Sequence, residues 1–346
     1  MIKRWQLWLG AGISAIFLIY ALWGLKLGQV WENMTQANYI WIIPGVLVYF
    51  LAVLARTWRW HYLLRPIQVI PVRSMWSPVV IGYMGNNILP FRAGEVVRAY
   101  VLKRNMGVSI GVGLATVLVE RVFDGLVMLI FVLIGLPRIP DIPLALQQTV
   151  IFASIGFSIA LIVLGIWAVK PALAQSVYTY FINRFAPQKL QARLLSLANN
   201  FTEGLQSLTS VQDVVMIFVT SIVIWLLETV KYWFVTYAFA FTVSFFTLML
   251  MNGVVNLATT LPSAPGYIGT FDTPGIEVLT IFGIDPDVAA AYTLVLHAAL
   301  WLPVTLLGLW YMYKEGLSFG ELRTASNQGA GDDVPAPEPM HSNREG

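Results

Sequence analysis

Long apolar runs alternate along this chain with short polar segments, and their lengths predict how the chain folds. The hydrocarbon core of a membrane is ~30 Å thick, so a helix needs about 20 apolar residues to cross it. Six runs reach about that length, at about 5–25, 39–60, 108–136, 147–169, 213–241 and 286–313. The pattern therefore predicts an all-α, polytopic integral membrane helix bundle.

Two further apolar stretches are interrupted and do not fit a single straight span. The first, at about 75–104, is broken by Asn-Asn-Ile-Leu-Pro at 86–90, and the second, at about 245–281, by a Pro- and Gly-rich sequence at 261–269. Proline ends a helix because it lacks an N–H and fixes φ, and glycine permits tight turns. We expect each stretch to form two half-helices that meet at a break, as in a re-entrant segment. Alternatively, each forms two tilted spans, which gives about eight or more spans in total.

Lys and Arg are concentrated in a few segments, and their positions predict the orientation of the chain. They gather at 3–4, 56–73, 92–104 and 170–193, and none occurs between 232 and 313. Because cytoplasmic loops carry an excess of Lys and Arg, both termini are expected in the cytoplasm. The first broken segment then enters the membrane from the cytoplasmic side and the second from the opposite side.

The two broken segments also resemble each other weakly in sequence. Each places Asn shortly before Leu-Pro, at 86–90 and 256–262, and a glycine and an acidic residue follow in both. With their opposite orientations they predict an inverted repeat, which is typical of transporters. Its halves are expected at about 1–170 and 211–316, within one transmembrane domain that covers 1–316.

Two segments differ in composition from these apolar halves. Residues 184–209 mix polar and apolar side chains and are expected to form an amphipathic cytoplasmic linker helix. Residues 317–346 are rich in Gly, Pro, Ser, Asn and acidic residues, so we expect a disordered cytoplasmic tail.

Composition supports the membrane assignment and excludes several kinds of chemistry. The chain is 58% hydrophobic and 11% charged, whereas soluble domains carry about 25% charged residues. There is no cysteine, and His61, His297 and His341 lie far apart, so no metal site is expected. The sequence contains no Walker loop, dinucleotide fingerprint or nucleophile triad, and neither a cofactor nor a nucleic-acid partner is expected.

The polar stretch 84–104 carries the first candidate site. If a short helix begins near Gly94, Glu95 lies in its first turn and shares a face with Arg98, with which it can pair. Arg92 and Arg98 would then bind a phosphate or lipid headgroup, with Asn86 and Asn87 beside them. The alternative is a juxtamembrane ion cluster that only sets the topology.

A second cluster, Glu120-Arg121-x-x-Asp124, lies inside the apolar run 108–136. Ionisable residues within a span are costly and usually functional. Arg121 and Asp124 can neutralise each other, so Glu120 needs another partner, for which Arg92 or Arg98 is suitable. A purely structural role in packing the bundle is the alternative.

Two further features are candidates for coupling or gating. Glu228 and Lys231 are i,i+3 neighbours within a predicted span. They form either a structural pair or a coupling site. The second break contains no basic residue, and it is a gate, a hinge or a ligand site. Its candidate residues are Pro262, Pro265, Gly266, Gly269 and Asp272.

Three motifs in order give the chain a family resemblance. They are Asn87-x-x-Pro90-x-x-x-Gly94-Glu95-x-x-Arg98, Glu120-Arg121-x-x-Asp124 and Pro262-x-x-Pro265-Gly266-x-x-Gly269. To about residue 316 the chain resembles the transmembrane region of lysylphosphatidylglycerol synthases, also described as a flippase-like domain. The resemblance implies a multi-pass protein of the bacterial or archaeal inner membrane that moves a lipid with a large polar headgroup between leaflets. The aminoacyl-transferase domain of the best-known members has no counterpart here, so the chain looks like a stand-alone member.

The leading hypothesis is therefore a lipid flippase whose substrate is an aminoacylated phospholipid, a glycolipid or a polyprenyl-linked sugar. The first alternative is a lipid-linked glycosyl- or phospho-transferase that uses Glu95, Glu120 or Asp124 as a base. The second is a non-catalytic subunit of a lipid or envelope biosynthesis complex. Enzymes of envelope-lipid or glycan synthesis are the expected protein partners, and homo-oligomer formation is left open.

Overall fold

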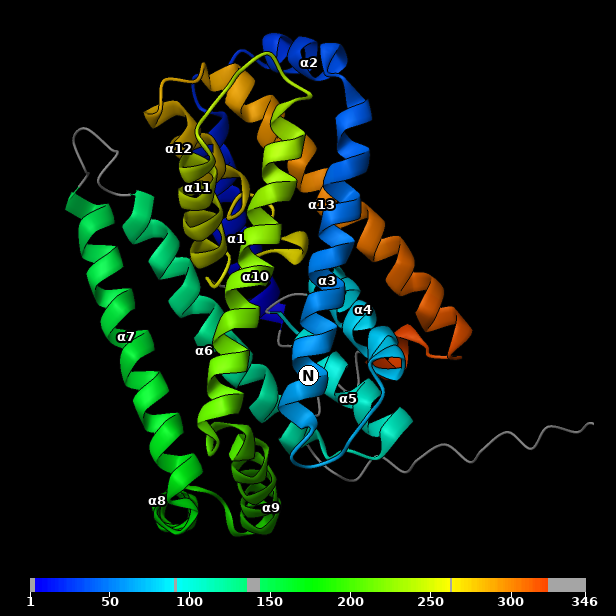
Figure 1. Ribbon diagram of the computed structural model, residues 1–346, viewed down its shortest axis with the longest axis vertical. Coiled ribbons are helices and arrows are strands. Elements are labelled where there is room, and N and C mark those ends of the chain that lie inside the picture. The colour runs from blue at the N-terminus through cyan, green and yellow to red at the C-terminus, as the bar shows by residue number, and fades with distance from the viewer. Residues whose placement is uncertain (1–3, 90–91, 136–143, 262, 323–346) are drawn as a thin grey trace, which may run out of the picture.

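The computed structural model describes residues 4–89, 92–135, 144–261 and 263–322, and all regular structure within them is helical (Figure 1). The α-helices are α1 (Arg4–Leu22), α2 (Leu27–Gln36), α3 (Ile42–Leu64), α4 (Val72–Ile88), α5 (Gly94–Met106), α6 (Ile110–Gly135), α7 (Leu144–Val169), α8 (Pro171–Phe185), α9 (Gln188–Gly204), α10 (Val211–Thr236), α11 (Phe245–Ala258), α12 (Asp272–Ile281) and α13 (Pro286–Lys314). Short 3₁₀ helices are η1 (Tyr39–Trp41), η3 (Leu205–Leu208) and η4 (Pro265–Tyr267).

Each of the six predicted spans contains a helix, but they differ in how well they suit a membrane. Among the described residues, three helical segments are long and apolar enough to cross one, and they are Tyr39–Leu64, Val211–Thr236 and Pro286–Lys314. A fourth candidate among the described residues is the pair Ile155–Val169 of α7 and Pro171–Phe185 of α8, which are bent by 109° at their junction. Helix α6 is as long as α10, but its three ionisable residues, at 120, 121 and 124, lie close together near the middle of the helix.

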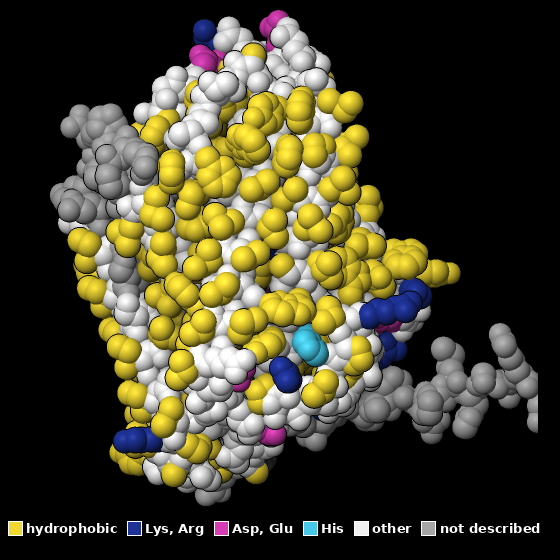
Figure 2. All heavy atoms as spheres, viewed as in Figure 1, with side chains coloured by type: hydrophobic (Ala, Val, Ile, Leu, Met, Phe, Trp, Pro, Cys, Tyr) yellow, Lys and Arg dark blue, Asp and Glu magenta, His cyan; other side chains and the backbone are white. Residues whose placement is uncertain are grey.

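The outer surface of the bundle is apolar across its middle. Figure 2 shows hydrophobic side chains over the central part of one face, with charged side chains gathered toward the two ends. Helix α10 contributes a stripe of exposed residues with a spacing of four, Val211, Val215, Val219 and Val223. Exposure of a continuous apolar stripe of this length to water is unfavourable, so these side chains suit contact with lipid.

Both stretches expected to be broken are pairs of helices. The first is α4 and α5, which pack against each other, and the second is α11 and α12, which are separated by η4. Glycine makes the first pair possible, because a Cβ on Gly94 would lie 2.0 Å from the carbonyl oxygen of Gly82. We call α4–α5 hairpin one and α11–α12 hairpin two.

The helices of the two halves have matching neighbours. Helix α3 packs against α10 at the centre (Figure 1). In hairpin one, α4 packs on α13 and α5 on α6, whereas in hairpin two α11 packs on α6 and α12 on α13. Exchanging α3–α6 with α10–α13 therefore reproduces the same set of contacts. In Figure 1, α2 and α9, which precede α3 and α10, lie at opposite ends of the molecule.

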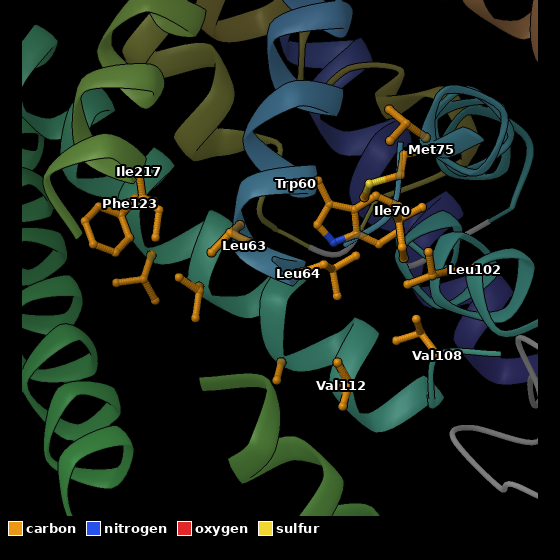
Figure 3. Packing of buried hydrophobic residues seen from close by; sticks show 14 of the residues in the cluster. Trp60, Leu63, Leu64, Ile70, Met75, Leu102, Val108, Val112, Phe123 and Ile217 are labelled. Atoms are coloured by element: carbon orange, nitrogen blue, oxygen red, sulfur yellow. The ribbon is translucent and has the colours of Figure 1, made fainter. Parts of the chain in front are cut away.

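A buried apolar cluster fixes hairpin one against α3 and α6. Figure 3 shows Trp60 and Leu64 of α3 on the side of Met75 and Leu102, and all four side chains are fully buried. This packing holds the preceding turn of α3, which carries the buried Arg56 and Arg59, inside the bundle.

The segments outside the two halves are partly described. The expected linker at 184–209 contains α9 and η3, and α9 packs on α6. Residues 317–322, which the sequence places in the disordered tail, pack against the bundle through the buried side chains of Leu317 and Leu322. Residues 323–346 lie outside the described part of the chain.

Candidate functional site

Asp124 of α6 is the centre of a buried ionic network. Its Oδ1 accepts hydrogen bonds from Nη1 of Arg59 at 2.6 Å and from the indole N–H of Trp225 at 3.0 Å. Its Oδ2 accepts from Nη2 of Arg59 at 3.2 Å and from Nη1 of Arg56 at 3.5 Å. Asp124 is 0% exposed, so this carboxylate holds α3 and α10 to α6 without competition from water.

Glu120, one turn away on α6, joins the same network to hairpin one. It accepts a hydrogen bond from Nη2 of Arg98, and Nε of Arg59 lies 3.6 Å from its other oxygen. The guanidinium of Arg98 lies over the ring of Trp60, 4.2 Å from its centroid. The sequence expectation that Glu120 needs Arg92 or Arg98 is met by Arg98.

Glu228 of α10 forms the opposite end of the network. It accepts from Nη2 of Arg56 at 3.1 Å and pairs with Lys231 on the same helix. The ammonium of Lys231 also lies over the ring of Tyr49, 4.4 Å from its centroid. The expected i,i+3 pair is therefore present, and it is tied to α3 rather than self-contained.

Glu95, at the start of α5, is shared by two arginines. Its Oε1 lies 3.2 Å from Nε of Arg92 and 3.2 Å from Nε of Arg121. Arg121 approaches Asp124 only to 3.8 Å. The expected Glu95–Arg98 pair is wrong, because Arg98 is drawn to the more deeply buried Glu120 instead.

The network as a whole carries excess positive charge. Within the described residues it contains six cationic side chains, Arg56, Arg59, Arg92, Arg98, Arg121 and Lys231, and four carboxylates, Glu95, Glu120, Asp124 and Glu228. The excess of two charges suits an anion, since an uncompensated buried charge is costly.

A cavity opens beside this network, between the two halves of the bundle. Arg56, Arg92, Arg121 and Lys231 line it, together with the one carboxylate Glu228. A neighbouring cavity shares Arg92 and Arg121 with it and adds Glu95 and Asp124. Polar amides complete the lining, from Asn86, Asn87 and Asn256.

The tips of the two hairpins meet at this cavity. Nη1 of Arg92 donates to the carbonyl of Thr259 at 3.5 Å, and its guanidinium lies 5.8 Å from the ring centroid of Tyr267. Asn87 donates to Oγ1 of Thr305 on α13 at 2.8 Å. Among the described non-glycine residues, only Arg92 (φ 52°) and Tyr267 (φ 61°) have positive φ, so each tip carries one strained residue and their side chains face each other.

The tip of hairpin two is fastened by a carboxylate–imidazole pair. Oδ2 of Asp272 accepts from the backbone N–H of Gly269 at 2.8 Å, and Oδ1 lies 2.8 Å from Nδ1 of His297 on α13. Nε2 of His297 lies 2.7 Å from the carbonyl oxygen of Gly266.

The other residues proposed for gating have different positions. Pro265 begins η4 and so shapes the tip, whereas Pro262 lies outside the described residues. Gly269 packs closely on α1, because a Cβ there would lie 2.7 Å from the carbonyl oxygen of Ser14. Among the described residues no group of His, Asp and Glu is arranged to hold a metal.

The site residues that are absent from the sequence-based candidates include Arg56, Arg59, Trp225 and His297. The two arginines were placed in a basic cytoplasmic segment, yet Arg56 is 6% exposed and Arg59 1%. Their i,i+3 spacing at the end of an apolar span is the signal that could have identified them, because such residues face one side of the helix.

Comparison with known proteins yields membrane proteins of archaea. A UPF0104 membrane protein of Methanothermobacter thermautotrophicus is 25% identical over 325 residues, which cover 90% of this chain and 94% of that protein. Another from Methanocaldococcus jannaschii is 24% identical and covers 86% of this chain and 91% of its own length. Glycosyltransferase AglD of Haloferax volcanii is 26% identical over 86% of this chain but only 53% of its own length.

No solved structure matches the chain. The sequence profile of one protein family, however, covers residues 7–308, which include both hairpins and the whole buried network. The chain is thus a multi-pass membrane protein that belongs to the family of the lysylphosphatidylglycerol synthase TM region.

Proposed function

We propose that this protein moves a membrane lipid with an anionic headgroup between the two leaflets of the bilayer. The observation that carries the proposal is the sharing of one carboxylate, Glu95, by Arg92 and Arg121 at the wall of the central cavities. Two guanidinium groups for one carboxylate leave a positive charge that a phosphate can neutralise through forked hydrogen bonds.

The arrangement of the halves supports alternating access to that site. We infer that residues 42–135 and 211–314 form an inverted repeat, with hairpins one and two as re-entrant segments that enter from opposite sides. Their tips meet beside the cavity, where discontinuous helices of transporters bind substrates. Because the basic residues of the loops lie at the end that holds α9, we place that end and both termini in the cytoplasm.

The network behind Arg121 has a separate role in this proposal. Arg98, Glu120 and Asp124 are nearly fully buried and paired with each other or with α3. They hold α6 and hairpin one in position, so that Arg92 and Arg121 face the cavity in fixed geometry. Asn86 and Asn87 supply neutral hydrogen bonds for the rest of the headgroup.

Lipid movement by the purified protein in liposomes tests the proposal. The probes are phosphatidylglycerol, which is anionic, and phosphatidylcholine, which is zwitterionic, each with a fluorescent label that a membrane-impermeant reductant quenches in the outer leaflet. The expected result is faster exchange of the phosphatidylglycerol label. Failure to move either probe, or equal movement of both, contradicts a site for anionic headgroups.

Matched variants assign the effect to the cavity. Arg92→Gln and Arg121→Gln each remove one charge-assisted hydrogen-bond donor worth about 1.5–3 kcal/mol, so we expect exchange to slow by about 10- to 100-fold. Arg184→Gln is the control, because Arg184 is exposed on α8 away from the cavity. Equal loss in all three variants would point to a general defect rather than to a headgroup site.

The likeness to glycosyltransferase AglD favours a second candidate, in which the chain serves a glycosyl transfer to a lipid carrier. The part of AglD that aligns with this chain is only about half of that protein. In this case Glu95 would be the base available at the cavity, or a partner enzyme would supply the chemistry. Incubation with sugar nucleotides and polyprenyl phosphate, followed by mass spectrometry of the lipids, distinguishes a transferase from a transporter.

A further inference from the structure

His297 faces a hydrogen-bond acceptor at each of its two ring nitrogens. Nδ1 lies 2.8 Å from a carboxylate oxygen of Asp272, and Nε2 lies 2.7 Å from the carbonyl oxygen of Gly266. A neutral imidazole donates from one nitrogen only, and a backbone carbonyl can never donate. Both contacts therefore form only if the Asp272–His297 pair carries one proton more than a neutral imidazole beside a carboxylate.

That additional proton has two alternative positions. It lies on His297, as imidazolium beside carboxylate, or on Oδ1 of Asp272, as a carboxylic acid that donates to Nδ1. In either form Nε2–H donates to Gly266, while Oδ2 of Asp272 accepts from Gly269. Asp272 is 2% exposed, whereas the His297 side chain is 14% exposed and lines the central cavity, which gives the proton a route in and out.

We propose that the Asp272–His297 pair is a proton-binding site whose proton is exchanged as the lipid moves, so that transport is coupled to a transmembrane proton gradient. The inference rests on the proposed function. The step is balanced, since the protonated pair loses H⁺ to water in the cavity and leaves a neutral imidazole and a carboxylate. No other bond forms or breaks.

Loss of the proton has a direct structural consequence. A neutral imidazole keeps its hydrogen bond either to Asp272 or to Gly266, and the other contact becomes a repulsion between lone pairs. The tip that depends on this contact is strained at Tyr267, a non-glycine residue in the left-handed conformation (φ 61°). Release of the tip moves the Tyr267 ring away from Arg92, and proton occupancy is thereby linked to the headgroup site.

Tyrosines and charged side chains line the same cavity as His297. The tyrosines, Tyr49, Tyr83 and Tyr267, are neutral near pH 7. The charged side chains that line the cavity are engaged in ion pairs, and they are Arg56, Arg92, Arg121, Glu228 and Lys231.

The protonation state can be measured without any transport assay. In ¹⁵N-histidine-labelled protein in lipid nanodiscs, ring nitrogen shifts distinguish imidazolium and carboxyl-bonded imidazole from an isolated neutral tautomer. His297→Gln assigns the signal, and His61→Gln is the control, because the imidazole of His61 bonds to the loop carbonyl of Ile70 and is not among the described residues that line the cavity. A His297 signal that stays neutral with a single N–H and no bond to a carboxyl group from pH 5 to 8 overturns the proton site.

The coupling is tested by the steady-state distribution of labelled phosphatidylglycerol in proteoliposomes with a clamped membrane potential. With one proton per lipid, each pH unit across the membrane shifts the leaflet ratio by up to about tenfold. We expect this asymmetry with the wild type and with His61→Gln, and an even distribution with His297→Gln.

The outcomes separate the two proposals. A wild-type protein that moves no phosphatidylglycerol refutes the proposed function, while the nitrogen shifts still decide the proton site. A wild-type protein that moves the lipid but leaves it evenly distributed under a pH gradient refutes the coupling alone. If His297→Gln is unstable, Asp272→Asn provides a second variant that retains a side chain of similar size and cannot share the proton.

Discussion

At the scale of single residues, this protein buries charged side chains that are tolerated because each has an oppositely charged partner. Asp124 is fully buried and accepts hydrogen bonds from three side chains on two other helices. An ion pair in such surroundings adds little net stability, but loss of one partner leaves the other charge buried and uncompensated. Within the sequence cluster at 120–124, Glu120 and Asp124 therefore join helices, whereas Arg121 lines the cavity.

Asp124→Asn tests this joint. The change leaves Arg56 and Arg59 without their shared carboxylate, so we expect a destabilisation of about 3–5 kcal/mol, measured by thermal unfolding in detergent. Asp213→Asn is the matched control, because Asp213 lies in the first turn of α10 outside the network. A similar melting temperature for both variants would show that the network is dispensable.

At the scale of elements, the hairpins follow from proline and glycine. The sequence places breaks near 90 and 262, and the structure has separate helices on either side of each. Hairpin one closes because Gly82, Gly85 and Gly94 let α4 and α5 approach to backbone contact. A side chain at any of these positions would separate the two helices and move Arg92 and Glu95.

Gly94→Ala is expected to destabilise hairpin one. The new Cβ would lie 2.0 Å from the Gly82 oxygen, and overpacking of this kind costs about 1–3 kcal/mol. Gly165→Ala in α7 meets no atom within 4 Å and should be neutral or slightly stabilising. Thermal unfolding and the rate of labelled phosphatidylglycerol exchange are the two measurements, and unchanged values for Gly94→Ala would argue against tight closure of the hairpin.

At the scale of the whole molecule, the matched contacts of the two halves are the main organising feature. Helix α2 packs on α13 at one end, and α9 packs on α6 at the other (Figure 1). If the halves are inverted in the membrane, these two surface helices lie on opposite faces of the bilayer.

Single cysteines test that topology, because the natural chain contains none. Gln29→Cys in α2 and Gln188→Cys in α9 both replace exposed glutamines. In intact cells, an impermeant maleimide is expected to label position 29 only, and position 188 only after the membrane is opened. Labelling of both positions in intact cells would contradict the inverted arrangement.

Sequence patterns and charge balance account for two of the ion pairs in the site. The Glu228–Lys231 pair follows from i,i+3 spacing, and Arg98 as the partner of Glu120 follows from the need to neutralise a buried carboxylate. The predicted pairing of Glu95 with Arg98 was wrong because i,i+3 spacing does not say how deeply each side chain is buried in the bundle. Arg56 and Arg59 were missed for the same reason, since hydropathy locates the end of a span but not the side that faces the interior.

The sequence by itself determined that this is a helical membrane protein, where its helices break, and which family it belongs to, because these depend on apolar length, proline, glycine and local motifs. Only the tertiary structure decided that Arg92 and Arg121 share one carboxylate, that the two hairpin tips meet, and that His297 lies between two acceptors. Those facts depend on contacts between helices far apart in the chain, and no local pattern of residues encodes the distance between them.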